Sequence, residues 1–246
     1  MKTSLSKMLN ILDVFGPDTL LLNVEDLAVK MNISRATAYR YVKELCDSGL
    51  LTKVEGSYSL GPRIIQLDWM MRQYDPLISS ARNLMIKMVE RTHLSVFISV
   101  LYDGKIINTH IESNNKSDGF TFGRGRPLPI FKGAQSKVLV SFHKGRKLQR
   151  IFHESIEPNP DYDFSWTDFL QITRTIRQQG YCETIDELNH GLTGIAAPIV
   201  HQTRNELLGS LAVVGTSDSF ELLRKDAVIN LVKETASEIS MKVAEN

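Results

Sequence analysis

Residues 34–43 carry side chains that are suited to contacting DNA. At helical spacing, three cations share one exposed face, with no acid before Glu44. Arginine can read guanine through paired hydrogen bonds, and lysine or serine can hold phosphates. We predict a DNA-contacting face with Arg40 on a base and the remaining members around it: Ser34, Arg35, Thr37, Tyr39 and Lys43. Thr37 and Tyr39 lie beside Arg40, and Arg35 and Lys43 serve phosphates.

Two short helices must position these side chains. The pattern predicts helices over 24–31 and 34–46, with Asn23 and Ser34 as N-caps and a tight break at residues 32–33. Apolar residues at helical spacing would bury the two helices against each other: Leu27, Ala28, Met31, Ile33, Ala38, Tyr41, Val42 and Leu45. Two helices joined in this way form a helix-turn-helix, whose second helix can enter the major groove.

A β-hairpin is predicted directly after the second helix. Gly49 suits the left-handed position that ends a helix, and residues 50–54 and 58–60 are strand candidates around a turn. Such a hairpin is a wing, on which Lys53, Ser57 and Tyr58 can touch the phosphate backbone or the minor groove. Two short helices alone also suit a helical hairpin with solvated charges. The wing and the one-sided cations favour DNA.

Composition and charge narrow the class of protein. The 246 residues have a formal net charge of +1, so any DNA-binding charge must be local. Cys46 and Cys182 form no metal pattern and no disulfide framework, and we expect Cys46 to be a buried thiol. The N-terminal residues lack a signal-peptide pattern, and no apolar run is long enough to cross a bilayer. We therefore expect a cytoplasmic protein with no membrane partner.

Other segments alternate between helical and strand patterns. Helices are predicted over 4–15, 63–74, 77–91, 145–153, 168–179 and about 218–242, and strands over 95–102, 105–112, 120–122 and 207–215. The opening helix would bury Leu5, Met8, Leu9, Leu12 and Phe15 on one face. Asp103-Gly104 is a strong hairpin signal. Ser165 or Thr167 would cap the helix that ends at Gly180.

Small residues gather where a loop enters a helix near residue 133. Gly133, Ala134 and Ser136 leave space at the helix start, where unpaired N–H groups could hold a ligand carboxylate. Tight packing of this helix on a sheet explains the same residues, and this segment alone slightly favours that explanation. The spacing of a P-loop is absent.

The chain as a whole resembles IclR-type bacterial transcriptional regulators. The resemblance rests on the opening helix, on Ile33-Ser-Arg-Ala-Thr-Ala-Tyr-Arg-Tyr41, on Tyr58-Ser-Leu-Gly-Pro62 and on the late motif of Gly180-Tyr181, Glu187, Gly191 and Ile195-Ala-Ala-Pro198. It implies an α+β chain with a winged helix-turn-helix at 1–61, a linker helix at 62–76 and, at 77–246, a GAF/profilin-like antiparallel sheet flanked by helices. It also implies a homodimer or tetramer, with the linker helix aiding dimerisation.

The same resemblance places an effector pocket in the second domain. Gly133 and Ala134 match pocket residues of the family. At other pocket positions, where some members have an acid, a cysteine or serines, this chain has Thr184, Gly194, Ala212 and Val214. We therefore expect a less polar pocket that takes an organic acid larger than the smallest keto acids, such as an aromatic one.

Enzyme chemistry finds little support in the sequence. No two histidines stand at the spacing of a helix-borne zinc pair, and no nucleophile elbow is present. Cys182 near His190 fits a core cysteine better than a nucleophile, and Glu183, Asp186 and Glu187 fit a solvated turn. We expect no catalytic residue, no metal and no cofactor.

The sequence thus predicts a regulator, by preference a repressor, that binds a double-stranded operator under control of a small-molecule effector. Ala36 replaces the usual serine of the family, so no target sequence is carried over. The alternative is a ligand-binding module whose helix-turn-helix serves protein contacts without specific DNA recognition. Salt dependence separates the two, because phosphate binding weakens steeply as salt rises.

Overall fold

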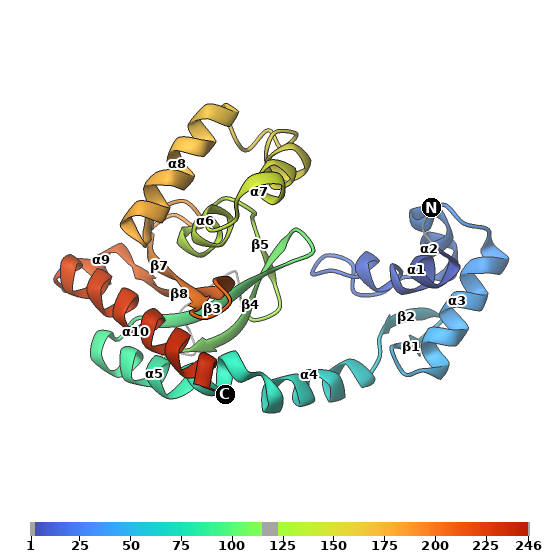
Figure 1. Cartoon of the computed structure of the whole chain (residues 1–246). Coiled ribbons are helices and arrows are strands. Elements are labelled where there is room, and N and C mark those ends of the chain that lie inside the picture. Colours follow the sequence, from blue (N-terminus) through green and yellow to red (C-terminus); the bar gives the residue numbers. More distant parts are fainter. Residues whose placement is uncertain (1–2, 115–122, 246) are drawn as a thin grey trace. The chain divides into compact units, whose positions relative to one another are not determined.

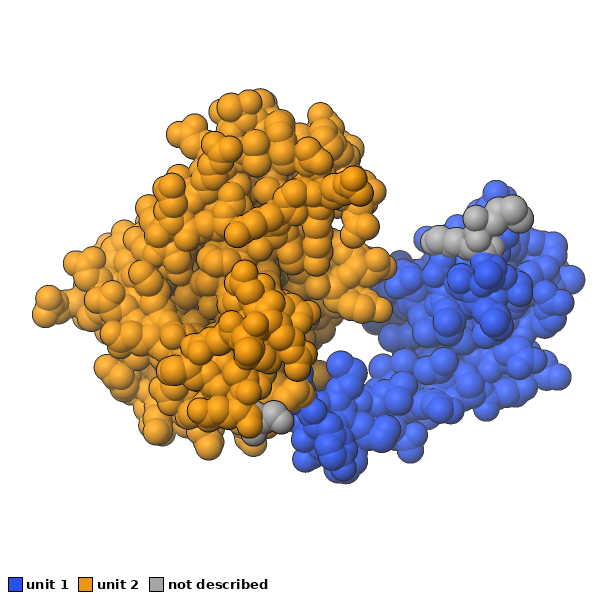
Figure 2. Space-filling view, in the orientation of Figure 1, with its two compact units in different colours: residues 1–75 blue, residues 76–246 orange. Residues whose placement is uncertain are grey.

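The computed structural model describes residues 3–114 and 123–245 (Figure 1). Contacts divide the chain into two compact units, Met1–Asp75 and Pro76–Asn246 (Figure 2). Each unit has its own hydrophobic core. Among the described residues, no helix combines the length and apolarity that crossing a membrane requires.

Unit 1 is a helical domain with a two-stranded hairpin. Its elements are α1 (Ser4–Leu9), the 3-10 turn η1 (Leu12–Val14), α2 (Val24–Met31), α3 (Arg35–Asp47), β1 (Leu51–Val54), β2 (Ser57–Leu60) and α4 (Arg63–Tyr74). The predicted helix-turn-helix and wing are therefore confirmed. Its core is formed by Ile11, Leu22, Leu27, Tyr41, Val42, Leu45 and Leu51.

Local hydrogen bonds explain where the two central helices begin. The side chain of Asn23 accepts from the N–H of Asp26 at 2.8 Å, and that of Ser34 accepts from the N–H of Thr37 at 3.2 Å. Both groups satisfy donors that a helix start leaves unpaired. Between the helices, Asn32 adopts a left-handed conformation with φ of 50°, which makes the tight break.

The opening helix differs from its prediction. It ends at Leu9 rather than Phe15, and Leu5 and Leu9 are exposed instead of buried. After Asn10 the chain tightens into η1, and this change of direction turns Ile11 completely into the core. Cys46 is half-buried, because it lies at the edge of this core rather than inside it.

Unit 2 is built on one antiparallel sheet. Its strands are β3 (Ser95–Tyr102), β4 (Lys105–Glu112), β5 (Pro127–Leu128), β6 (Cys182–Ile185), β7 (Leu192–His201) and β8 (Glu206–Thr216), in the spatial order β5-β4-β3-β8-β7-β6. Its helices are α5 (Pro76–Thr92), α6 (Ala134–Ser141), α7 (Gly145–Ile151), the π-helical turn η2 (Phe152–Ile156), α8 (Trp166–Gln179), α9 (Ser217–Glu221) and α10 (Lys225–Glu245).

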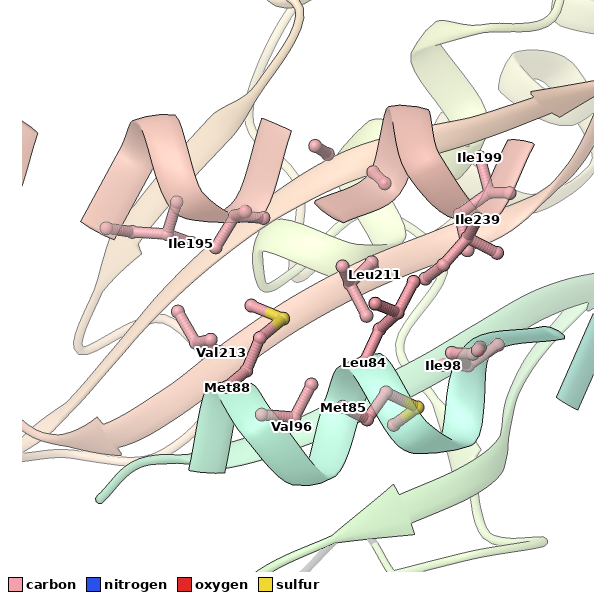
Figure 3. Close-up of a cluster of buried hydrophobic side chains, with 14 of the residues drawn as sticks. Leu84, Met85, Met88, Val96, Ile98, Ile195, Ile199, Leu211, Val213 and Ile239 are labelled. Atoms are coloured by element: carbon pink, nitrogen blue, oxygen red, sulfur yellow. The ribbon is translucent and has the colours of Figure 1, made fainter. Parts of the chain in front are cut away.

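Helices cover both faces of this sheet (Figure 1). On one face, α5 and α10 pack together against β3, β7 and β8. Figure 3 shows Met85 and Met88 of α5 beside the alternating side chains of the strands, such as Ile98, Leu211 and Val213. On the other face, α6 packs on β7 and β8 and is itself covered by α8. The predicted α+β class is therefore confirmed.

Several element boundaries differ from the sequence prediction. The closing helix is divided into α9 and α10, because the chain breaks its helical path at residues 222–224, where Leu223 packs against the core. Strand β5 was not predicted, and the strand expected at 120–122 lies outside the described residues. Ser165, and not Thr167, is the N-cap of α8. Its side chain accepts from the N–H of Asp168, and the side chain of Asp168 accepts from the N–H of Ser165.

Candidate functional site

A cationic groove lies between α3 and the wing in unit 1. The groove has a volume of about 540 Å³. The lining residues are Tyr39, Arg40, Lys43 and Cys46 of α3, Lys53 of β1 and Tyr58 of β2. The structure thus brings together five of the nine side chains that the sequence predicted for DNA contact. Three of those five are cations, and phosphates are the groups that such a groove attracts.

The two arginines of α3 are held differently. The guanidinium of Arg35 forms an ion pair with Glu25 of α2 and lies 5.6 Å from the ring centroid of Tyr39. A hydrogen bond with Tyr39 and the charge of Glu25 raise the pKa of Arg35, so this group is charged at any working pH. The guanidinium of Arg40 lies 5.5 Å from the ring centroid of Tyr41 and lines the groove.

Four predicted DNA contacts do not line the groove. Ser34 and Thr37 share a hydrogen bond of 2.9 Å between their hydroxyls at the start of α3, where Ser34 also caps the helix. Ser57 begins β2 and pairs with Val54 next to the hairpin turn. Arg35, the fourth residue that does not line the groove, is the one paired with Glu25.

The wing is tied to the helical core through Tyr58. Its backbone exchanges two hydrogen bonds with Leu22, at 2.8 and 3.0 Å. This bridge fixes the hairpin relative to the helices, so Lys53 keeps its place opposite α3.

Burial raises the pKa of the Cys46 thiol, which makes it a poor nucleophile at neutral pH.

In unit 2, predicted effector residues converge around Gly194. A methyl group added at Gly194 would lie 3.7 Å from Cγ2 of Val214 and 3.8 Å from both Cβ of Ala134 and Oγ1 of Thr184. Thr184, Gly194 and Val214 are direct neighbours across β6, β7 and β8. Ala212, two residues before Val214, packs with Ala134 in one buried cluster. We call Ala134, Thr184, Gly194, Ala212 and Val214 the Gly194 cluster.

Gly133 contributes through its backbone. It caps α6 with φ of 83°, and a Cβ there would lie only 2.5 Å from Cδ1 of Leu188. Its N–H donates to Oε2 of Glu187 at 3.1 Å, and the other oxygen of Glu187 pairs with Lys137. One of the N–H groups that we expected to bind a ligand carboxylate therefore donates to a carboxylate of the chain itself.

Sheet register adds two residues that the sequence analysis missed. Ser95 pairs with Val214, and Phe97 pairs with Ala212, so both lie on β3 beside the Gly194 cluster. Ser95 and Phe97 are buried, and Oγ of Ser95 donates to Oγ of Ser113 at 2.8 Å. Their spacing of two residues was the available signal, but only the pairing of β3 with β8 shows which strand they face.

The acidic residues in and after β6 were expected to be solvated in one turn, and the structure pairs each of them separately. Glu187 pairs with Lys137, Glu183 pairs with Lys225 at 2.6 Å, and Asp186 accepts from the N–H of Gly191. Each carboxylate has its own partner, because the folded turn separates them. In the described part of the chain, no group of three His, Cys, Asp or Glu side chains could hold a metal.

Cys182 is buried on the edge strand β6, as expected for a core cysteine. Burial raises the pKa of its thiol to about 12, so the thiol stays protonated at neutral pH. His190, its neighbour in sequence, is almost fully exposed and lies 3.5 Å from Asp186 instead. Cys182 therefore lacks the thiolate form that a cysteine nucleophile requires.

Two family models match the chain. Residues 4–55 match the IclR helix-turn-helix domain, and residues 72–241 match the C-terminal domain of bacterial transcriptional regulators of the IclR type. The p-hydroxybenzoate hydroxylase transcriptional activator of Acinetobacter baylyi is 26% identical, over 96% of this chain and 89% of its own. The regulator KdgR of Escherichia coli is 24% identical, over 90% of this chain and 83% of its own.

Solved structures have the same fold. A putative IclR-type regulator from Silicibacter superposes with a TM-score of 0.84 at 19% identity, over 98% of this chain and 96% of its own. An IclR homologue from Microbacterium hydrocarbonoxydans, complexed with 4-hydroxybenzoate, superposes with a TM-score of 0.77 at 17% identity, over 99% of this chain and all of its own.

Proposed function

The chain belongs to the IclR family of bacterial transcriptional regulators, and we propose that it is a repressor whose binding to operator DNA is controlled by a small organic acid. In this proposal residues 1–61 bind DNA, residues 62–76 link the domains and residues 77–246 bind the effector. The effector shifts the balance between DNA-binding and released forms. Such coupling is reciprocal, so operator DNA must change effector affinity by the same factor.

The side chains in and beside the Gly194 cluster support the proposed effector class. Ala134, Gly194, Ala212 and Val214 are apolar, and Phe97 adds an aromatic ring beside them. Thr184 and Ser95 supply hydroxyls at one row of the sheet. An aromatic ring suits the apolar side chains, and a hydroxyl or carboxylate suits the polar row. A relative named as the transcriptional activator of p-hydroxybenzoate hydroxylase and a homologue complexed with 4-hydroxybenzoate support an aromatic acid.

For DNA, the groove between α3 and the wing supports Arg40 as the base contact. Lys43 and Lys53 flank it and would hold phosphates, with Tyr39 and Tyr58 packed beside them. Arg35, already oriented by Glu25, would reach a phosphate at the start of α3, near Ser34 and Thr37, and Ser57 would contact the backbone from the wing.

A homodimer, or a dimer of dimers, would present two such α3 helices to successive major grooves. Helix α4 supports this part of the proposal, because none of its side chains is buried within the chain and several large apolar ones are exposed: Ile65, Trp69, Met70 and Met71. An apolar helix surface of this kind is stabilised by burial against a second copy.

Fluorescence anisotropy on the DNA upstream of the gene tests the DNA proposal. Across a salt series, the wild type should bind tightly, prefer this DNA to random DNA and weaken steeply as salt rises. Arg40→Ala should lose about 1–3 kcal/mol of that preference. Lys30→Ala removes an exposed cation outside the groove and is the matched control. Equal preference in both variants would contradict the assignment of Arg40.

Calorimetry with two acids tests the effector proposal. The full chain should bind 4-hydroxybenzoate more tightly than pyruvate. Gly194→Ala adds a methyl group at ordinary contact distance from its neighbours, so it should fold normally. The variant should weaken binding of the aromatic acid by roughly tenfold and change binding of pyruvate little, because the added methyl group removes space that only the larger acid needs. Pyruvate that binds as well as the aromatic acid would refute the aromatic effector.

A further inference from the structure

A hollow in unit 2 lies at the opposite end of α6 from Gly133. It has a volume of about 520 Å³ and lies between the end of α6, the start of α7, helix α8 and the turn that joins β7 to β8. We call it the Arg177 pocket. Its lining residues are Phe142, His143, Lys144, Lys147, Arg177, Val200, Asn205, Glu206 and Leu207. None of them belongs to the Gly194 cluster.

The charges of this pocket are unbalanced. Lys144, Lys147 and Arg177 face one carboxylate, that of Glu206. Within residues 3–114 and 123–245, none of these three cations forms an ion pair with a carboxylate. An excess of positive charge inside a concave wall attracts and concentrates anions.

Arg177 is the innermost of the three cations. Its side chain is half-buried, and Nη1 donates a hydrogen bond to the carbonyl oxygen of Ser141 at the end of α6. Burial and the nearby Arg174 lower the pKa of Arg177, because both disfavour its charged form. The guanidinium remains charged at neutral pH, and its planar fork matches a phosphate.

His143 adds an unsatisfied group to the same wall. Its Nε2 is buried and finds no hydrogen-bond partner among the residues that the structure describes. Burial and the charge of Lys147 lower the pKa of His143 to about 4, so the imidazole is neutral at pH 7. A buried polar atom of this kind is destabilising until a ligand or water pairs with it.

We propose that the Arg177 pocket binds the phosphate group of a small organic phosphate. Three cations against one carboxylate leave two positive charges, which match the charge of a phosphate monoester better than that of a monocarboxylate. The volume lies within the range of small-molecule sites. The phosphate faces Arg177 and the two lysines, and the carbon skeleton lies against Phe142, Val200 and Leu207.

This site is independent of the proposed effector site, although one helix joins them. Ala134 of the Gly194 cluster begins α6, and Phe142 and His143 of the Arg177 pocket follow its last residue, Ser141. The two sites share no residue, so phosphate binding in the Arg177 pocket does not depend on the nature of the proposed effector.

Calorimetric titration of the full chain with three ligands tests the proposal. Glycerol 3-phosphate should bind with one site per chain. Glycerate, which replaces the phosphate with a carboxylate on a similar skeleton, should bind at least roughly tenfold more weakly, and inorganic phosphate should also bind more weakly because it lacks the carbon skeleton. Glycerate binding as tightly would overturn the phosphate assignment, and inorganic phosphate binding as tightly would overturn the organic one.

Paired variants locate the binding to this pocket. Lys147→Gln and Arg177→Gln should each weaken glycerol 3-phosphate binding by roughly tenfold or more. Their controls, Arg146→Gln and Arg174→Gln, remove the same charge from neighbouring exposed residues that do not line the pocket, and should leave binding within about twofold.

Lys147 is exposed, so its variant should fold even if Arg177→Gln disturbs the end of α6. Circular dichroism of all four variants checks this. No binding of glycerol 3-phosphate up to about 10 mM, or equal weakening in all four variants, would overturn the proposal.

Discussion

Replacing Glu187 with glutamine should destabilise unit 2 by removing one charge from the start of α6. Glutamine keeps an oxygen that can accept from the N–H of Gly133, so this hydrogen bond survives. The ion pair between Glu187 and Lys137 is lost, and the ammonium of Lys137 keeps no carboxylate partner. The substitution therefore isolates the contribution of the charge.

The exposure of the two side chains sets the expected magnitude. Hydrogen bonds to charged groups contribute about 1.5–3 kcal/mol, whereas exposed ion pairs contribute about 0–1 kcal/mol. Glu187 is 30% exposed and Lys137 is 19% exposed, so the pair lies between these cases. We expect Glu187→Gln to lower the free energy of unfolding by about 1–2 kcal/mol.

Urea unfolding followed by tryptophan fluorescence measures this change. The chain has two tryptophans, Trp69 in unit 1 and Trp166 in unit 2, so a Trp69→Phe background reports on unit 2 alone. Glu183→Gln is the matched control, because Glu183 pairs with a lysine that is 57% exposed. It should cost less than about 1 kcal/mol. If both variants unfold at the same urea concentration, the ion pair at α6 has no special weight and the reasoning fails.

Further substitutions test backbone, titration and core. Gly133→Ala should lower the free energy of unfolding by about 2–3 kcal/mol, because it places a Cβ against Leu188 in a residue with positive φ. Gly125→Ala also has positive φ but open space around it, and should lower this free energy by about 1 kcal/mol. Thermal unfolding compares the two variants. Because the pKa of His143 is lowered in the folded state, the unfolded state binds more protons between about pH 4 and 6.5. The free energy of unfolding should therefore fall as the pH drops through that window. The wild type should have a lower urea midpoint at pH 5 than at pH 7, and this difference should become smaller in His143→Gln. Ile11→Ala should cost about 2–4 kcal/mol and Leu5→Ala less than about 0.5 kcal/mol, and equal urea midpoints would contradict the observed core of unit 1.

Much of the local structure could be predicted because its causes lie within a few residues. Asn23 and Ser34 cap their helices through bonds to residues three positions later, and Asp103 and Gly104 both adopt the positive φ that their hairpin needs. The cations of α3 lie where helical periodicity puts them. These features depend on backbone sterics and short-range hydrogen bonds, which the order of residues expresses directly.

The sites depended on contacts that no local pattern contains. Glu187 lies about fifty positions after the helix start that it neutralises, at Gly133 and Lys137. Ser95 and Phe97 join the Gly194 cluster only because β3 pairs with β8 in one register.

Apolar residues in and just after the first helix show the same division between sequence and tertiary structure. Leu5, Leu9 and Ile11 are all suited to a core, and the chain buries Ile11 because the turn after Asn10 points it inward. The sequence by itself determined the type of most helices and of the strands β1 to β4 and β8, and the face of α3 that carries the cations. Only the tertiary structure decided which distant side chains meet, because burial and strand register are properties of the assembled fold.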